Sequence, residues 1–265
     1  MLRKLIKYDM RYGVKIIVLI HAVFLFACLS GRILFVRNID FQADLQSSVF
    51  MITMILCIYI LLFSAASFGT SALLAVRFYK NLFTNEGYLT WTVPATALQQ
   101  LWSKIISGAI WYSLDITCVY LGLVLLLTTS NVLQAYKHVA PEFIDIFGMS
   151  AFQFGLAMFM LTLFTAVASV ITIYTCIVIG QLFPGHRVLC ALVVYFIIYI
   201  ILQAISTAGL FIFHLTPAVR NTSGSTAFFT QFFGILIWVL ILSAIFAIIE
   251  YLITRHIMTK KLNLC

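Results

Sequence analysis

The feature that most constrains this chain is the recurrence of runs of about 20 apolar residues along nearly its whole length. A helix of that length crosses the hydrocarbon layer of a bilayer, which is roughly 30 Å thick. Only 9% of the 265 residues are charged, against roughly 25% in an average soluble domain. Stretches such as 235–249 are apolar on every face, which argues against the alternating strands of a membrane barrel. We therefore predict an all-α polytopic membrane protein.

The apolar runs predict six transmembrane helices, which together make residues 14–265 a single membrane domain. Their expected bounds are 14–35, 48–76, 104–129, 147–180, 188–214 and 230–254. The fourth span is expected to begin in the outer interface, because Pro141 followed by Glu142 is typical of a helix start.

The distribution of positive charge predicts the orientation. With the N-terminus inside, twelve of the 16 Lys and Arg residues fall in inner segments and four in outer segments. The inner cations are Arg3, Lys4, Lys7, Arg11, Lys15, Arg77, Lys80, Lys104, Arg187, Arg255, Lys260 and Lys261. The outer cations are Arg32, Arg37, Lys137 and Arg220. Both termini are therefore expected in the cytoplasm, and the basic charge is interpreted as a topology signal rather than a nucleic-acid surface.

Residues 1–13 are expected to form an amphipathic helix. Apolar side chains at positions 2, 5, 6 and 10 fall on one helical face, and cations at positions 3, 4, 7 and 11 occupy the rest. Such a helix lies flat in the inner interface, with its cations near anionic lipid headgroups. The alternative is a topology signal with no further role, and the residues leave both open.

The inner segment 77–103, between the second and third spans, is long and rich in aromatic residues. Gly87 is typical of the position that closes a helix, here a short one ending at about Glu86, with 88–93 then extended. Thr96 and Gln99 match a capping box that starts the next helix. The aromatic cluster either docks on another protein or dips into the headgroup zone, and the residues alone favour neither.

This segment resembles the inner loop of type-2 ABC exporter permeases, in which a short coupling helix docks on a separate ATPase subunit. The similarity lies in RFYKNLF at 77–83, TNEGYLT at 84–90 and VPAT at 93–96, and the ending KKLNL at 260–264 is similar to that of small bacterial members. The layout of six spans with both termini inside agrees over the whole chain. The brief segment 215–229, rich in Ser, Thr and Gly, departs from the short outer helices that members often carry there.

The resemblance implies a permease subunit in a bacterial cytoplasmic membrane, paired with a second permease subunit and with ATPase subunits that hold ATP and Mg. The residues that it places at the ATPase-coupling interface are Phe78, Tyr79, Leu82, Phe83, Glu86, Gly87 and Tyr88. The aromatic and leucine side chains would fill a groove on the ATPase. Glu86 and Gly87 would set the turn, and Glu86 would offer a charge to a basic residue of the partner.

Two polar residues of the spans are candidates for a transport path. Asp115 lies near the middle of the third span, where an acid costs about 2.5–3.5 kcal/mol on insertion scales. It either lines the path, or carries a proton, or forms a structural hydrogen bond with a partner such as His21 or Thr117. His21, in the first span, has the same alternatives. Glu250 lies close to Arg255, so a local ion pair is expected there.

Small residues four positions apart in the second span allow close helix approach. The two pairs are Ala65 with Gly69 and Ser67 with Ser71. They mark either a contact with a second permease subunit or ordinary packing within the bundle.

Two functions of different classes remain. The first is a permease subunit that exports an amphipathic or hydrophobic peptide, lipid or drug, energised by a separate ATPase. The alternative is an ATP-independent membrane binding or immunity protein that sequesters a toxic peptide and needs no docking loop. The sequence has no GxxxxGK[ST] phosphate loop, no HExxH and no nucleophile elbow. We therefore expect no catalytic residue, metal or cofactor on this chain.

Overall fold

The computed structural model describes residues 1–39, 45–212 and 225–260. All the regular structure in these ranges is helical. The helices are α1 Leu2–Leu34, η1 Val36–Asn38, α2 Leu45–Phe83, α3 Asn85–Thr92, α4 Ala97–Leu127, α5 Ser130–Phe147, α6 Ala151–Gly180, α7 Arg187–Ile212 and α8 Ser225–Lys260. Six of them, α1, α2, α4, α6, α7 and α8, are long and apolar enough to cross a membrane. The prediction of an all-α protein with six helices suited to crossing a membrane is therefore confirmed for the described residues.

Some sequence predictions fall outside the described residues. These are the end of the fifth span, most of the segment 215–229 with Arg220, and the C-terminal segment that follows Lys260.

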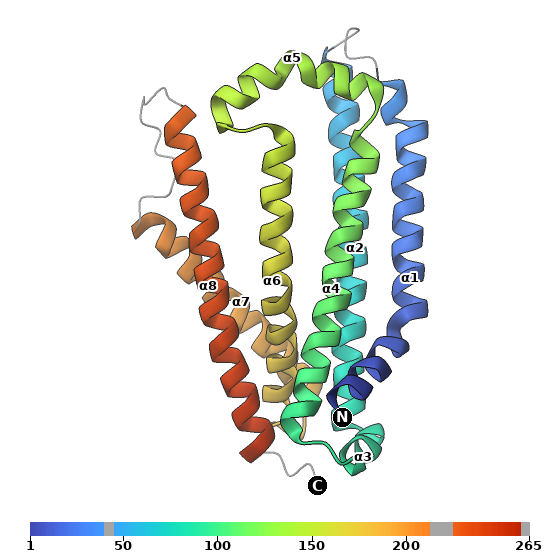
Figure 1. Ribbon diagram of the computed structural model, residues 1–265, viewed down its shortest axis with the longest axis vertical. Coiled ribbons are helices and arrows are strands. Elements are labelled where there is room, and N and C mark those ends of the chain that lie inside the picture. The colour runs from blue at the N-terminus through green and yellow to red at the C-terminus, as the bar shows by residue number, and fades with distance from the viewer. Residues whose placement is uncertain (40–44, 213–224, 261–265) are drawn as a thin grey trace.

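Successive long helices run in opposite directions, so the connections gather at two ends of the bundle (Figure 1). The N-terminus, α3 and the last turn of α8 lie at one end, which we call the α3 end. Helix α5 lies across the opposite end, which we call the α5 end (Figure 1). The first turns of α1 bend away from the direction of the rest of that helix (Figure 1).

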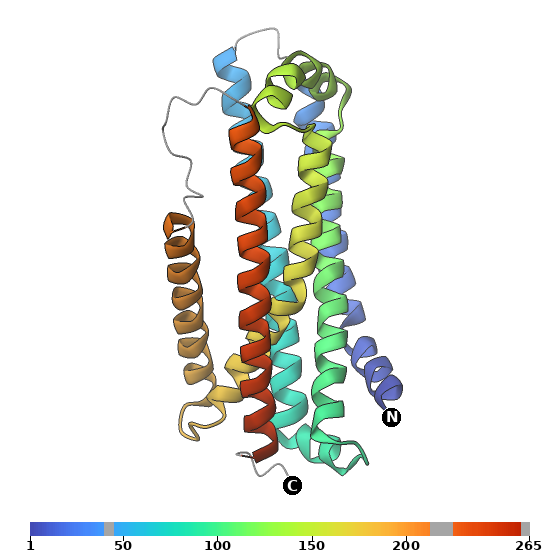
Figure 2. The same cartoon turned by 60° about the vertical axis from the view of Figure 1, so that its left-hand side comes forward.

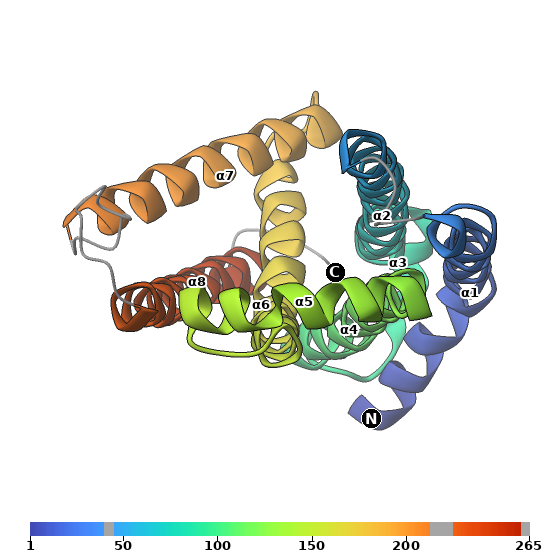
Figure 3. The ribbon, with the colours of Figure 1, turned by 90° about the horizontal axis from the view of Figure 1, so that it is seen from above.

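Four helices form the main packed row of the bundle. Helix α1 packs on α4, α4 on α6, and α6 on α8, while α2 closes one side against α1 and α4. Helix α7 lies outside this row against α6 (Figures 2 and 3). Among the residues of α7, only Gly209 is buried. A helix that is apolar on all sides and uncovered by its own chain is suited to a hydrocarbon surrounding.

The aromatic core of the bundle lies toward the α3 end. Phe78 of α2 is fully buried and its ring stacks on that of Tyr174 of α6, with 4.0 Å between the ring centroids. Leu101 and Ile105 of α4 pack in the same cluster. Because Phe78 packs in this core, α2 extends past residue 76, the predicted end of the second span, and ends at Phe83.

The local structure of segment 77–103 differs from the prediction. Gly87 does not close a helix, because α2 ends at Phe83 and Gly87 lies inside α3. Residues 88–92, predicted as extended, are helical. The glycine is needed for a different reason, since a Cβ at Gly87 would lie 2.7 Å from the carbonyl oxygen of Leu82. The predicted capping box of Thr96 and Gln99 is confirmed at the start of α4.

The predicted helix start at Pro141 is wrong. Pro141 lies inside α5, which ends at Phe147 and is followed by Gly148 in the left-handed conformation with φ 68°. Helix α6 begins after Ser150, whose side chain accepts from the backbone N–H of Gln153 in a capping box. The chain therefore has a separate helix at the α5 end before the fourth span begins.

The close contact of α1 with α4 predicts that Gly122→Ala destabilises the protein. A Cβ at Gly122 would lie 2.6 Å from the ring of Phe24 in α1, and overpacking of this kind costs about 1–3 kcal/mol. Gly155→Ala is the matched control, because a Cβ at Gly155 meets nothing within 4 Å. Scanning fluorimetry in detergent should give a lower midpoint for Gly122→Ala and an unchanged or slightly higher one for Gly155→Ala. Equal midpoints would contradict the packing.

Candidate functional site

Four charged residues from four helical segments meet at the α3 end, and we call them the α3-end charge network. They are Asp9 of α1, Arg77 of α2, Glu86 of α3 and Lys104 of α4. The ammonium group of Lys104 donates to Oδ1 of Asp9. Nη2 of Arg77 lies 4.0 Å from the same oxygen, and Nη1 of Arg77 lies 3.8 Å from Oε2 of Glu86.

Most of this network is removed from solvent. Asp9, Arg77 and Lys104 are 6%, 9% and 3% exposed, whereas the side chain of Glu86 is 57% exposed. Ser103 donates to the second carboxylate oxygen of Asp9 at 3.1 Å. Charges in such an environment interact strongly, and loss of one partner leaves the others buried without compensation. Asp9 therefore holds α1 to α4 and lies beside the guanidinium of α2.

Helix α3 is attached to both of the long helices that flank it. The indole N–H of Trp91 in α3 donates to the carbonyl of Leu82 in α2 at 3.1 Å. The side-chain amide of Gln100 in α4 donates to the carbonyl of Thr90 in α3 at 3.2 Å. Together with the close approach at Gly87, these bonds attach α3 to the ends of α2 and α4.

The structure corrects part of the predicted ATPase-coupling interface. Phe78 and Leu82 are 0% and 2% exposed, so the prediction that their side chains project toward a partner is wrong for this conformation. Both side chains belong to the buried apolar core that α2 forms with α4 and α6. Tyr79 and Phe83 are partly buried against this core.

The exposed side chains at this end lie on α3 itself. Tyr88 is 76% exposed and Leu89 is 69% exposed. Tyr88 was among the predicted interface residues, and Leu89 was not. A helical rather than extended assignment for residues 85–92 would have placed Leu89 beside Tyr88 and Glu86 on the surface.

A second polar cluster surrounds Asp115 of α4, which is 1% exposed. Its Oδ1 lies 2.8 Å from Nε2 of His21 in α1 and accepts from the hydroxyl of Thr70 at 3.0 Å. Its Oδ2 accepts from Ser67 at 2.7 Å. His21 is the partner that the sequence suggested, whereas Thr117 donates to the carbonyl of Ser113 in its own helix.

Both ring nitrogens of His21 have partners. Its Nδ1 lies 2.7 Å from the carbonyl oxygen of Ile17, one turn earlier in α1, and its Nε2 faces Asp115 of α4. This arrangement fits a structural clamp joining α1, α2 and α4.

The small residues of α2 do not share one outer face. Ser67 bonds to Asp115 inside the chain, which favours packing within the bundle, the second of the two alternatives, at this position. A Cβ at Gly69 would lie 3.4 Å from Ile20 of α1, which makes Gly69 a packing position between α1 and α2. Ser71 is partly buried, and Ala65 is exposed. A subunit contact at Ala65 stays a prediction.

A third cluster joins α6 to α8. Glu250, which is 4% exposed, accepts from the hydroxyl of Thr172 at 2.6 Å. Thr175 donates to the backbone carbonyl of Glu250 at 3.3 Å and lies 2.8 Å from the hydroxyl of Thr254. The predicted ion pair with Arg255 is wrong, since none of the ion pairs of the described residues joins these two and Arg255 is exposed. The bonding partners lie across the helix interface instead.

No protein-family description matches this chain, and neither a curated protein nor a solved structure is significantly similar to it.

Replacing members of the α3-end charge network should destabilise the protein in a defined order. Asp9→Leu leaves Lys104 and Arg77 buried without their shared carboxylate, and such changes cost about 3–5 kcal/mol. Lys104→Met should cost less, because Asp9 keeps Arg77 nearby. The double variant should cost less than the sum of the single variants. The free energy of unfolding, measured by denaturant titration in mixed micelles, tests this order.

The control for this series is Asp145→Leu, which replaces an exposed acid of α5. Its free energy of unfolding should stay within about 0.5 kcal/mol of the parent value. An Asp9→Leu variant that is as stable as this control would show that the network does not hold the helices together.

The Asp115 cluster predicts that Asp115→Leu is more harmful than Asp115→Asn. Leucine removes the acceptor for the hydroxyls of Ser67 and Thr70 and the partner of the His21 ring. Each buried polar group left without a bond lowers the free energy of unfolding by about 1–3 kcal/mol. Asparagine keeps an accepting oxygen and should cost less. Thr117→Val, which removes a bond within one helix only, is the control. Equal unfolding midpoints for the Leu and Asn variants would contradict the clamp.

Proposed function

We propose that this chain is the transmembrane permease subunit of an ATP-driven exporter and that a separate ATPase subunit docks on α3. The observation that carries the proposal is the two-sided character of this helix. One side presents Tyr88 and Leu89 to the surroundings, and the other side is bonded to the ends of α2 and α4. A helix that served only as a connection would not need both features.

The exposed side of α3 suits a mixed apolar and charged partner surface. Tyr88 and Leu89 offer an aromatic and an aliphatic side chain, and Glu86 adds a carboxylate that is 57% exposed. A groove with an apolar floor and a cation at its edge is complementary to this set. Buried anchors of this kind carry most of the energy of a protein interface.

The α3-end charge network provides a route from the docking surface to the spans. Displacement of α3 acts on α2 through Glu86 with Arg77 and through Trp91 with the carbonyl of Leu82. It acts on α4 through Gln100. Asp9 extends the same contacts to α1. An ATPase that binds two arrangements of this end with different affinity would shift the whole set of helices between them.

In this proposal the α3 end lies in the cytoplasm of a bacterium, as the excess of Lys and Arg in the segments at that end favours. ATP and Mg belong to the ATPase chain, and a second permease subunit, identical or homologous, completes the assembly. The apolar spans suit an amphipathic or hydrophobic substrate, either a peptide, a lipid or a drug. The residues Asp115 and His21 serve as a clamp within the bundle rather than as a proton carrier.

Substitution of Leu89 by Asp should release the ATPase. A charge at a buried interface anchor costs about 2 kcal/mol or more of binding free energy. This loss raises the dissociation constant by about 30-fold. Tagged protein purified from host membranes in mild detergent should bring down an ATPase chain, and Leu89→Asp should lose it. Phe183→Asp is the matched control, because Phe183 is 51% exposed in the connection between α6 and α7 at the same end.

Two results would contradict this proposal. If Leu89→Asp folds and retains the ATPase fully, α3 is not the docking surface. If the parent protein brings down no nucleotide-hydrolysing chain, the ATP-independent binding or immunity function is favoured instead.

A further inference from the structure

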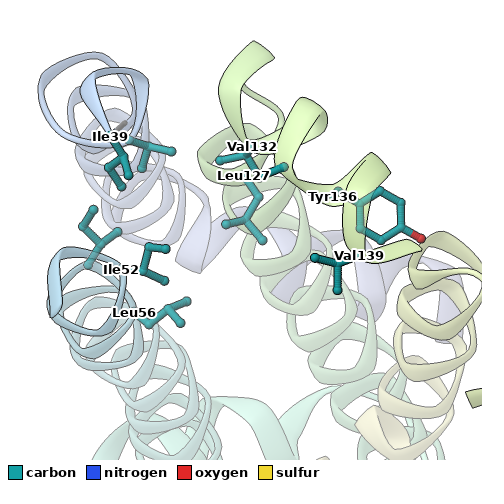
Figure 4. Close-up of a pocket in the computed structure, with 10 residues that line it drawn as sticks. Ile39, Ile52, Leu56, Leu127, Val132, Tyr136 and Val139 are labelled. Carbon is teal, nitrogen blue, oxygen red and sulfur yellow. The ribbon is translucent and has the colours of Figure 1, made fainter. Parts of the chain in front are cut away.

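A pocket of about 320 Å³ lies at the α5 end, between η1, α2 and α4 and beneath α5. Figure 4 shows Ile52 and Leu56 of α2 on one side of this space, with Leu127 of α4 and Val139 of α5 on the other. Ile39, which follows η1, lines it near the end of α1. The pocket is therefore built by four helical segments and not by one surface groove.

The lining of the pocket is hydrocarbon. The one hydroxyl among the lining side chains belongs to Tyr136, and it already accepts a hydrogen bond from the backbone N–H of Ala151 at 3.1 Å. Its oxygen points away from the other labelled side chains (Figure 4). Pockets that bind polar ligands place a few polar groups so as to orient them, and the Tyr136 hydroxyl is the one such side-chain group in this lining. The part of a ligand inside this pocket must therefore itself be hydrocarbon.

The size and surroundings of the pocket restrict the class of possible ligands further. Its volume is at the lower end of the range for small-molecule sites, about 300–1,000 Å³, which suits one slender chain better than a folded peptide. Two exposed cations are sequence neighbours of lining residues. Arg37 follows Val36, and Lys137 follows Tyr136. Cations at a membrane surface attract anionic headgroups.

We propose that this α5-end pocket binds a single alkyl or acyl chain of an amphiphile, whose anionic head lies near Arg37 and Lys137. The amphiphile is either a phospholipid of the bilayer or a single-chain molecule, and the hydrocarbon chain is common to both. Binding there places a chain between α2 and α5 and so supports the packing of α5 over the bundle. This inference does not rest on the proposed transport function.

Photolabelling in vesicles tests the site with two defined probes. The full chain is reconstituted in phosphatidylethanolamine and phosphatidylglycerol vesicles that contain either a phosphatidylglycerol with a diazirine in one acyl chain or a diazirine fatty acid. Labelled positions are then mapped by mass spectrometry. Ala135→Phe and Ile52→Trp, at two lining positions on α5 and α2, add side-chain volume to the space. Leu133→Phe is the control, because Leu133 lies on α5, is 49% exposed and does not line the pocket.

We expect labelling of the lining segments 52–56 and 132–139 to exceed, severalfold, that of the lipid-facing residues Val193 and Ile197 of α7. It should fall at least fivefold in both filled variants and stay unchanged in Leu133→Phe. Labelling by the phospholipid probe identifies a bilayer lipid, and labelling by the fatty acid alone identifies a single-chain amphiphile. The inference is overturned if neither probe labels the lining above the level of α7, or if both filled variants fold and are labelled like the parent.

Discussion

The structure depends on the requirement that polar groups in a hydrocarbon surrounding find partners within the chain. Three buried acids are bonded across helix interfaces, and each one joins different helices, although Oε1 of Glu250 has no hydrogen-bond partner among the described residues. Asp9 bonds to Lys104, Asp115 to His21 and Ser67, and Glu250 to Thr172. Both Lys104 and Asp115 lie on α4, about three turns apart. Helix α4 is therefore the element on which α1 and α2 are fixed, while Glu250 fixes α8 on α6.

The same requirement explains why the α3 end is densely bonded and α7 is not deeply packed. At the α3 end, charges that would be costly alone are gathered into one network, and α3 is bonded to helices on both of its sides. Helix α7 has no buried ionised group among its described residues, and its contact with α8 is made where Gly209 allows the ring of Trp238 to approach. Among the residues of α7, only Gly209 is buried, which leaves its outer face exposed.

The sequence was sufficient for the six spans, because long apolar runs determine helices in a bilayer. For Asp115 it indicated that a buried acid needs a polar partner, but it left His21 and Thr117 as alternatives, and only the structure selects His21. It was insufficient where charge was interpreted as topology alone. Arg77 and Lys104 were counted as inner cations, yet both are buried beside Asp9. The signal that could have revealed this is Asp9 itself, the one acid among the cations of residues 1–13. Tertiary contacts then extended α2 past residue 76 and buried Phe78, which no local pattern specifies.

The central claim is that the exposed side of α3 is covered by an ATPase in the cell. The most direct test is a photoreactive amino acid at position 89, activated in native membranes, followed by identification of every crosslinked molecule. We predict a crosslink to a protein chain that contains a nucleotide-binding phosphate loop, and loss of that crosslink when the same amino acid is placed at position 183. Crosslinks to lipid alone at position 89 would show that α3 rests in the headgroup zone and would contradict the account.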